Sequence, residues 1–406
     1  MLGLSEAFLR GVEGRVSEET FVAIEEPDII RDRALAGLPE SLTCLAAILP
    51  ARYQQAQEFL GVAVAAHAQW TFDAVMPGIE YGVVPAAVVA SRLGLPGATE
   101  HAARILSDKS RLREVTAAAG ILNPRSREIT GPDDITAFAS GGPAVVKPTN
   151  RQASLGVQLL DRTGPDEAAA AWETLVTAHE PTEVERPIGS RYLVEERLRG
   201  PELSVEVLVD AGEVIFQNIT AKSVIPGPHP VELGHTVPAP VEPGTADAHT
   251  WRMTALVKAT GFDTGILHAE WIVTPDGPAL IECAGRCPGD RIMDLIDLAY
   301  GTTLRCALLD LLAGGHPCLP GRPGGVSAIR FLSAAPGQVS QIRGVEEAQQ
   351  LTGVRELNLV VSDGSEIKPW TSSWDRPGYV IITGRDVGEV GQCADAVVAT
   401  VQILTR

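Results

Sequence analysis

Apolar and polar positions alternate on two length scales in the first 98 residues of the chain. Short apolar runs at 21–24, 45–49 and 74–76 are typical of buried strands, because strands covered on both faces read as continuous apolar segments. The longer stretch 81–92 predicts a helix, and the sequence GLPG at 94–97 ends it. This alternation predicts a doubly wound α/β domain over residues 1–98. The segment has no G-x-G-x-x-G fingerprint, which argues against dinucleotide binding there.

Hairpins and helices are mixed in the rest of the chain. Ser107 or Asp108 can cap a helix that runs to about residue 119. The other predicted elements are strands at 144–147, 156–160 and 192–196, a helix at 166–179, a hairpin of 203–209 with 213–220, a hairpin that turns at 275–277, and a helix at 291–300. Residues 314–325 are rich in Gly and Pro and predict a linker. The segment after it predicts a separate small α+β unit with strands at 326–332 and 379–383.

The chain has 406 residues and a net charge of −18, and this length predicts two or three domains. The acidic balance argues against a nucleic-acid partner, but a single nucleotide can still bind in a locally basic pocket. No apolar run reaches the ~18 residues of a membrane span, and residues 1–15 lack a signal-peptide pattern, so a cytoplasmic protein without membrane contact is expected. The six cysteines are scattered, which favours reduced cysteines over a zinc site.

The clearest chemical signal is a pair of glutamates on the second hairpin. A turn centred on Asp276 places Glu270 opposite Glu282, and His268 opposite Ala284, on one face of the sheet. Two carboxylates that face each other repel, and a divalent cation between them removes that penalty. Oxygen ligands of this kind favour Mg²⁺. The alternative is a solvated sheet face with two ordinary glutamates, and a bulge in the turn would break the register.

A loop follows this hairpin and leads directly into a helix. It carries Arg286, Gly289 and Asp290. Backbone N–H groups at a helix start attract anions, and an arginine adds a forked cationic donor. The alternative is a surface arginine on a turn.

Two further segments fit a nucleotide site. Lys147 ends a strand, and the following loop of small and polar residues, with Ser154 and Gly156, could fold over phosphates. The strand 192–196 ends in Glu195 and Glu196 and breaks at Gly-Pro, so it can offer backbone groups to adenine and carboxylates to adenine or ribose. Each segment has a plain alternative, a solvated lysine or an acidic strand end at the surface.

Taken in chain order, these segments resemble the ATP-grasp superfamily over residues 99–312. The ordered set consists of a helix with Lys109, the strand with Lys147, the Ser/Gly loop, the V-E-E hinge with G-x-E, and the H-x-E and E-x-x-x-R hairpin. Segments 327–332 and 376–380 resemble the C-terminal part of bacilysin-type L-amino acid ligases. The resemblance implies an N-terminal domain at 1–98, a lid subdomain with the phosphate loop at 99–190, a large subdomain with hinge and metal site at 191–313, and a C-terminal α+β subdomain at 314–406.

The resemblance also implies roles for individual residues. Those for ATP are Lys109, Lys147, Ser154, Gly156, Glu195, Glu196, Leu198, Glu202 and Lys222. Those for Mg²⁺, or Mn²⁺ in its place, are Glu270 and Glu282. Those for the substrates are Glu232, His235, His268, Arg286, Gly289 and Asp290, and those for catalysis are Arg286, Lys147 and Ser154.

Three departures from the family pattern stand out. Ala284 occupies the position where many ATP-grasp enzymes have a metal-binding asparagine, so water would supply that ligand or it would be missing. The loop 149–156 has fewer glycines than is common, so its closure can differ. The extreme N-terminus lacks the usual first strand and glycine turn.

The predicted function is that of an ATP-dependent carboxylate–amine ligase, which forms an amide through an acyl phosphate and releases ADP and phosphate. Its expected partners are a small-molecule carboxylate and an amine, and the sequence names neither. Two alternatives remain open. One is a carboxylase-like enzyme that forms carboxyphosphate, and the other is a catalytically silent nucleotide-binding protein. A homodimer is a further expectation.

Overall fold

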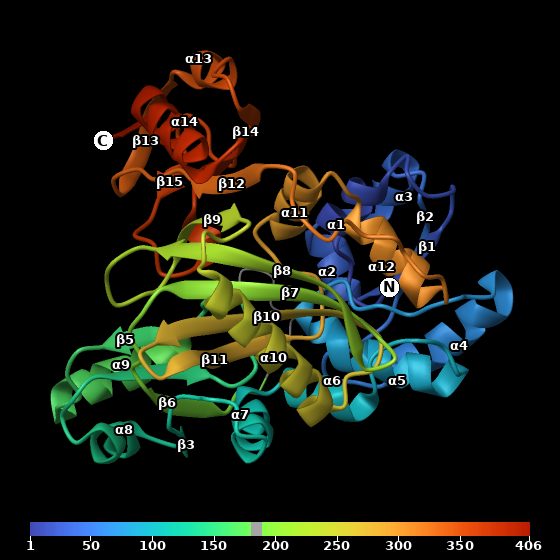
Figure 1. The fold of residues 1–406 in the computed structure, drawn as a ribbon, viewed down its shortest axis with the longest axis horizontal. Helices are drawn as coiled ribbons and strands as arrows, with labels where there is room; N and C mark the ends of the chain where they lie inside the picture. Colours follow the sequence, from blue (N-terminus) through green and yellow to red (C-terminus); the bar gives the residue numbers. More distant parts are fainter. Residues whose placement is uncertain (180–188) are drawn as a thin grey trace.

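An eight-stranded sheet forms the centre of the computed structural model, which describes residues 1–179 and 189–406 (Figure 1). Residues 180–188 of the predicted lid subdomain lie outside the described residues. The strands are β7 (Glu202–Asp210), β8 (Glu213–Val224), β9 (Glu232–Val237), β10 (Gly265–Thr274), β11 (Gly277–Ala284), β12 (Val326–Phe331), β14 (Val354–Leu359) and β16 (Gly378–Gly384). Their order in the sheet is β11-β10-β7-β8-β9-β12-β16-β14.

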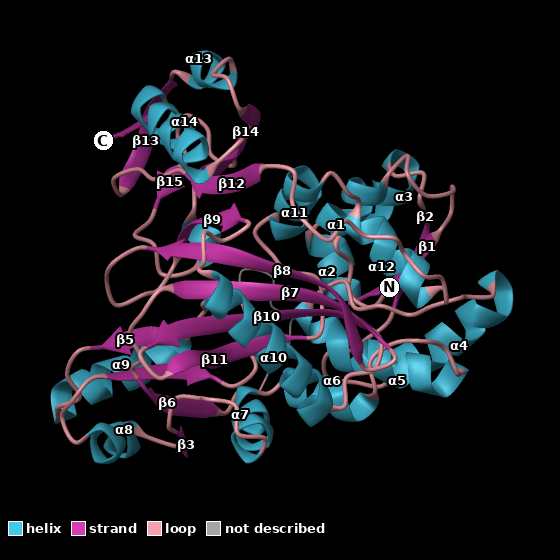
Figure 2. Ribbon diagram, viewed as in Figure 1, coloured by secondary structure: helices cyan, strands magenta, loops and turns pink. Residues whose placement is uncertain are grey.

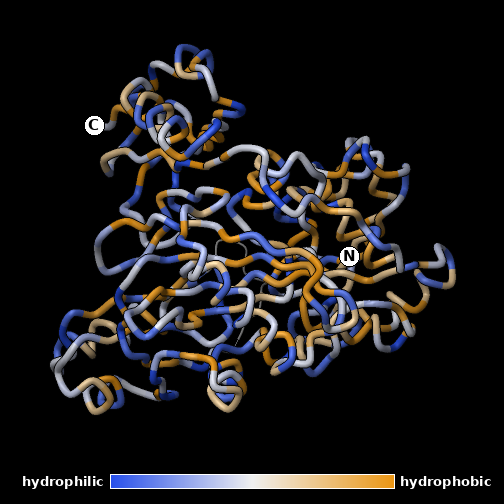
Figure 3. Tube along the Cα trace, viewed as in Figure 1, coloured by the Kyte–Doolittle hydropathy of each residue, from blue (hydrophilic) through white to orange (hydrophobic). Residues whose placement is uncertain are grey.

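The two faces of this sheet differ because side chains alternate along each strand. In β7, Val205, Val207 and Val209 are buried in an apolar cluster. The helix α10 (Pro243–Thr260) crosses that face of the sheet (Figures 1 and 2). Between these valines, Ser204 and Glu206 point to the opposite side and make polar contacts there. The trace coloured by hydropathy follows the same division, with hydrophobic stretches along the central strands and hydrophilic ones in peripheral loops (Figure 3).

A four-stranded sheet lies beside the central sheet, at the lower left of Figure 1. Its strands, in spatial order, are β3 (Ser126–Ile129), β6 (Tyr192–Glu196), β4 (Ala144–Pro148) and β5 (Gln158–Leu160). The helices α8 (Pro132–Ala139) and α9 (Pro165–Thr177) pack on it around a small apolar core. The helices α6 (Glu100–Leu106) and α7 (Lys109–Ala118) connect it to the N-terminal region, and Asp108 caps α7 as predicted.

The N-terminal region contains the short parallel strands β1 (Phe21–Glu25) and β2 (Leu45–Pro50). The predicted third strand at 74–76 is wrong, because the backbone there makes only an isolated bridge from Leu2 to Pro77. Leu2 also bridges Ile24 of β1, so this single residue takes the place of the usual first strand. The helices around these strands are α1 (Glu6–Val12), α2 (Pro27–Asp32), α3 (Leu38–Ser41), α4 (Glu58–Trp70) and α5 (Val83–Leu93), with single 3₁₀ turns at Leu35–Gly37 and Glu80–Gly82.

The C-terminal segment is not separate from the central sheet. Three of its strands extend that sheet, because β12 pairs with β9 on one side and with β16 on the other. The helices α11 (Ile292–Tyr300) and α12 (Leu304–Leu312) precede this segment. Its other elements are α13 (Val345–Gln349), α14 (Val387–Thr400), β13 (Gly337–Arg343), β15 (Glu366–Ile367), β17 (Gln402–Thr405) and a 3₁₀ turn at Ser373–Asp375. The expectation of a separate unit is therefore wrong in this respect, whereas the subdomain boundaries stay predictions. No helix of the described ranges is long and apolar enough to span a bilayer.

The core contains one histidine without a hydrogen-bond partner among the described residues. His249 of α10 is fully buried, its ring stacks edge-on against Trp271, and neither ring nitrogen has a partner. Burial lowers the pKa of His249 to about 4, with a smaller contribution from Arg252.

Replacing His249 by leucine is expected to raise the free energy of unfolding by about 1–2 kcal/mol at pH 7, because an unsatisfied polar ring leaves the core. The lowered pKa of His249 means that the unfolded chain takes up the proton first, so wild-type stability falls from about pH 6.5 towards about pH 4. The stability of the leucine variant should fall less than that of the wild type between those two pH values. Urea unfolding at several pH values measures both effects. The same substitution at the exposed His316 serves as the control, and an equal change there would contradict the explanation.

Candidate active site

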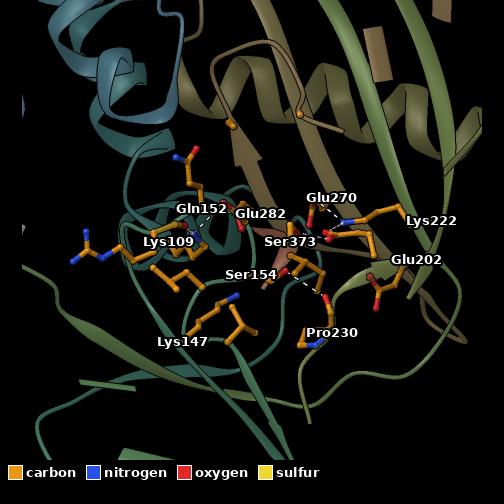
Figure 4. Close-up of a pocket in the computed structure, with 18 of the residues that line it drawn as sticks. Lys109, Lys147, Gln152, Ser154, Glu202, Lys222, Pro230, Glu270, Glu282 and Ser373 are labelled. Carbon is orange, nitrogen blue, oxygen red and sulfur yellow. Dashed lines mark hydrogen bonds and ion pairs between the residues drawn. The ribbon is translucent and has the colours of Figure 1, made fainter. Parts of the chain in front are cut away.

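A cavity of about 780 Å³ lies between the small sheet and the central sheet (Figure 4). All the predicted site residues except Gly156 line its wall. They are Lys109, Lys147, Ser154, Glu195, Glu196, Leu198, Glu202, Lys222, Glu232, His235, His268, Glu270, Glu282, Arg286, Gly289 and Asp290. Gly156 lies in the loop behind the wall, with φ of 72°, and a Cβ there would come within 3.2 Å of Pro148. Its place in this tight turn accounts for the glycine, although it does not face the cavity.

The two hairpin glutamates are paired across the strands as predicted, but by a different route. The turn itself is shorter than expected, since Thr274 pairs with Gly277. An irregularity between Glu270 and Trp271 then shifts the register by one position and restores the pairing of Glu270 with Glu282. The bulge in the strand therefore compensates for the turn being shorter than predicted. His268 pairs with Ala284, also as predicted.

Each of these glutamates is engaged by a lysine through one oxygen only. Lys109 Nζ lies 3.0 Å from Oε1 of Glu282, and Lys222 Nζ lies 2.7 Å from Oε1 of Glu270 (Figure 4). Oε2 of either glutamate has no partner among residues 1–179 and 189–406. Two carboxylate oxygens thus remain for a hard cation, a donor set that fits Mg²⁺ or Mn²⁺. Within those residues no group of three or more His, Cys, Asp or Glu could hold a metal, so phosphates and water would supply the other ligands.

Lys222 is the centre of an acidic group whose members the sequence predicted as site residues with separate roles. Glu270 and Glu232 lie 2.7 and 3.5 Å from its Nζ, and Glu202 adds a third nearby carboxylate. Burial alone would lower the pKa of Lys222, but these carboxylates raise it above its usual value. Lys222 therefore carries its charge at all physiological pH values and neutralises the acids around it.

A buried glutamate holds His268 in place and was missed by sequence reasoning. Glu206 is fully buried in β7, and its Oε1 lies 2.9 Å from Nδ1 of His268. It also accepts hydrogen bonds from the side chains of Ser204, Asn218 and Thr220. Burial alone would lower the pKa of His268, but its hydrogen bonds to Glu206 and Glu270 raise it to about 9. A lone glutamate inside an apolar strand was the signal that could have indicated it.

On the wall formed by the small sheet, Lys147 belongs to a buried charge triad. Glu195 lies 2.6 Å from Nζ of Lys147 and 2.9 Å from Nε of Arg113. Burial alone would raise the pKa of Glu195, but Arg113 and Lys147 lower it. The single carboxylate between two cations holds Lys147 at the cavity wall. Arg113 was not predicted, because its place on a polar helix gives no sign of its burial.

The loop after Lys147 is held over the cavity by contacts with two other segments. Ser154 Oγ donates to the carbonyl of Pro230 at 3.3 Å, as Figure 4 shows, and the backbone N–H of Ser373 donates to the carbonyl of Ala153. Ala153 and Ser154 both have positive φ, near 55°, where glycine is usually found. Because the loop has few glycines, these two strained positions at its tip are occupied by alanine and serine.

The predicted substrate residues form one network with a C-terminal arginine. Asp290 accepts hydrogen bonds from both terminal nitrogens of Arg376, and His235 Nε2 lies 2.9 Å from Asp290. Glu232 accepts a hydrogen bond from Ser373 Oγ at 2.9 Å. Arg376 and Ser373 were not predicted as site residues. They reach the cavity because the C-terminal strands extend the central sheet, a long-range pairing that leaves no local pattern.

Arg286 is oriented by the N-terminal region. Its Nε donates to Glu80 at 2.7 Å and one terminal nitrogen donates to the carbonyl of Cys287. The second terminal nitrogen has no partner among the described residues. Burial alone would lower the pKa of Arg286, but Glu80 raises it. Arg286 thus presents a fixed cation with a free donor to an anionic group in the cavity.

Comparisons with known proteins agree with this geometry. Residues 140–294 match the family model of the ATP-grasp domain, and residues 330–406 match that of the L-amino acid ligase C-terminal domain 2. The chain is 28% identical over 296 residues to the uncharacterized protein y4rH of Sinorhizobium fredii, covering 72% of this chain and 60% of that protein. It is 27% identical over 265 residues to alanine–anticapsin ligase of Bacillus subtilis, covering 60% and 54%. It is also 28% identical over 253 residues to carnosine synthase 1 of Gallus gallus, covering 59% and 27%.

The alignments thus span about half the length of the bacterial ligase and 60% of y4rH. Among solved structures, the fold is similar to L-amino acid ligase from Bacillus licheniformis, with a TM-score of 0.81, 20% identity, and coverage of 100% of this chain and 98% of that one. It is also similar to phosphoribosylglycinamide synthetase from Anaerococcus prevotii, with a TM-score of 0.70, 16% identity, and coverage of 100% and 98%. The fold is therefore that of the ATP-grasp proteins.

Proposed function

We propose that this chain, an ATP-grasp protein with the C-terminal domain of the L-amino acid ligases, is an ATP-dependent carboxylate–amine ligase. One observation carries the proposal. Two carboxylates face each other across a hairpin, each is held by a lysine through one oxygen, and Arg286 lies on the same cavity wall with a free donor. A site that transfers a phosphoryl group to a carboxylate needs these parts. The likeness of the chain to alanine–anticapsin ligase and to carnosine synthase 1 supports the same class of reaction.

The nucleotide is assigned to the side of the cavity nearest the small sheet. Lys109 and Lys147 bind the phosphates of ATP, and the loop with Ser154 covers them. The end of β6, with Glu196, and the segment after it, with Leu198, hold adenine. The remaining assignments to the nucleotide are Glu195, which fixes Lys147, Glu202 at ribose, and Lys222. Bound between Glu270 and Glu282, Mg²⁺ would neutralise charge on the transferred phosphoryl group.

The reaction proceeds in two steps. A carboxylate oxygen of the acid attacks the γ-phosphorus of ATP, the bond from that phosphorus to the β-bridging oxygen breaks, and ADP forms. The amine nitrogen then attacks the carbonyl carbon of the acyl phosphate, the bond from that carbon to the phosphate oxygen breaks, and the amine proton passes to solvent. Arg286 offers its free donor to the oxyanion of the second step. Exclusion of water by the covering loop protects the acyl phosphate from hydrolysis.

The acid substrate is assigned to the group around Glu232, His235 and Asp290. These side chains line the same cavity as Glu270, Glu282 and Arg286; Glu232 lies 3.5 Å from Lys222, and His235 contacts Asp290. The carboxylate of Glu232 suits the ammonium group of an amino acid, while Arg286 suits its activated carboxyl group. His268 and Gly289 complete this part of the wall. A cytoplasmic location, a homodimer and the lack of nucleic-acid or membrane partners stay predictions from the sequence.

A release assay tests the proposal directly. The protein with ATP and Mg²⁺ is mixed with pairs of amino acids, ADP and phosphate are measured, and hits are analysed by mass spectrometry. We expect ADP release that depends on both acid and amine, with an amide of the summed mass less water. Release of AMP and pyrophosphate would contradict the mechanism. ADP release with bicarbonate and no amine would favour the carboxylase-like alternative, and the complete absence of turnover would favour the silent nucleotide-binding protein.

A further inference from the structure

A second chamber of about 560 Å³ adjoins the main cavity. The two spaces share part of their walls, including Arg286, Asp290, Trp374 and Arg376. Of the residues assigned to the acid, Glu232, His235 and His268 line only the main cavity, whereas Gly289 and Asp290 line both spaces. The side chamber therefore meets the main cavity at Arg286, where the activated carboxyl group is placed.

The part of the wall that belongs only to the side chamber is largely apolar. Its large apolar and aromatic side chains are Phe8, Met293, Phe331, Val360 and Tyr379. Val360 is 66% exposed and Trp374 is 48% exposed, so two apolar side chains of the chamber wall are also in contact with solvent. Such exposed apolar groups at the opening of a cavity are typical of a ligand site.

Apart from Arg286, which keeps one free donor beside its bond to Glu80, the charged side chains of the chamber are already paired. Arg291 is bound by Asp294 and Glu356, and Arg305 is bound by Asp294. Asp290 and Arg376 bind each other in a bidentate ion pair. These pairs leave little net charge to attract an ion. The chamber consequently favours the apolar body of a ligand.

We propose that the side chamber binds the amine substrate by its apolar body, with Trp374 and Val360 selecting amines that carry a large apolar or aromatic group. This inference rests on the proposed function, which requires a second substrate to reach the acyl phosphate while nucleotide fills the main cavity. The chamber provides that approach, because Arg286 lines both spaces while Glu232 and Lys222 line only the main cavity. The C-terminal segment, which supplies Val360 and Trp374, sets the selectivity.

Kinetics with amines of graded size test the proposal. With the acid found in the release assay, KM is measured for glycine, leucine and phenylalanine as the amine. In Trp374→Ala, the ratio of KM for phenylalanine to KM for glycine should rise about tenfold, since contact with an indole face is lost. Val360→Asp, at a surface position that tolerates charge, should raise the same ratio. KM for ATP and for the acid should change little in either variant.

Trp251→Ala is the matched control. Trp251 is 60% exposed on α10, outside both cavities, and its loss should leave the ratio unchanged. Equal KM changes for glycine and phenylalanine, no change in either, or a change confined to the acid would overturn the assignment of the chamber while ligation persists. If no pair of substrates gives ADP release, the proposed function itself is contradicted, and this inference with it.

Discussion

Glu282→Ala is expected to reduce ADP release by about a thousandfold or more while the protein stays folded. Glu282 supplies one of the two carboxylate oxygens that remain free opposite each other in the cavity, and it also holds Lys109 at 3.0 Å. Its removal leaves Glu270 alone to bind a divalent cation. The side chain of Glu282 is 30% exposed, and Lys109 keeps its hydrogen bond to the carbonyl of Arg151, so the loss of folding stability should be smaller than for a fully buried ion pair. Turnover is measured by coupled ADP release, and folding by thermal unfolding.

The control for this variant lies on the same hairpin. Asp276 is exposed in the turn and does not line the cavity, so Asp276→Ala should keep near-normal turnover. A second measurement is independent of catalysis: Mn²⁺ binding with ADP, followed by electron paramagnetic resonance, should weaken in Glu282→Ala and not in Asp276→Ala. Normal Mn²⁺ binding in the Glu282 variant would show that the cation is held elsewhere.

The charge pattern of the cavity explains why such a site can exist in the absence of nucleotide. Lys109 neutralises Glu282, Lys222 neutralises Glu270, and Lys147 neutralises Glu195. Each pair offsets the cost of burying its members. ATP brings its phosphates together with a cation. When it binds, the lysines can pair with the phosphates in place of the carboxylates, and the carboxylates can bind the cation in place of the lysines. Binding then redistributes partners without leaving a charge unpaired.

The parts of the site that the sequence predicted are those in which local spacing decides geometry. Strand alternation and a turn were enough to pair Glu270 with Glu282, although the compensating bulge was not foreseen. Capping by Asp108 placed Lys109 at the start of α7. In each case, residues close in sequence determine the outcome.

The residues that sequence reasoning missed are brought to the site by packing between segments that are far apart in the sequence. Glu80 reaches Arg286 from the N-terminal region, and Arg376 reaches Asp290 from the C-terminal segment. Glu206 meets His268 only because β7 and β10 are neighbours in the sheet. None of these pairs has a period or motif of its own. The wrong prediction of a separate C-terminal unit has the same origin, since the pairing of β12 with β9 cannot be read from either strand.

Glu195→Ala is expected to lower the free energy of unfolding by about 3–5 kcal/mol, the usual cost of leaving buried charges without their partner. Glu195 is 2% exposed, and both Arg113 and Lys147 depend on it. Burial already lowers the pKa of Lys147, and loss of Glu195 would lower it further and release the lysine from the cavity wall. Urea unfolding measures the stability loss.

The matched control is Glu196→Ala, the next residue of the same strand. Glu196 pairs with Arg125 at 3.2 Å in a partly exposed position, and its loss should cost less than about 1 kcal/mol. The pH dependence gives an independent check. Because the pKa of Glu195 is lowered in the folded protein, its contribution is complete above the unfolded-state pKa of about 4.3 and is lost as the pH falls below it. The difference in stability between wild type and Glu195→Ala should therefore shrink on acidification. A difference that stayed constant from pH 7 to pH 3 would mean that shape, and not the charge between Arg113 and Lys147, makes Glu195 necessary.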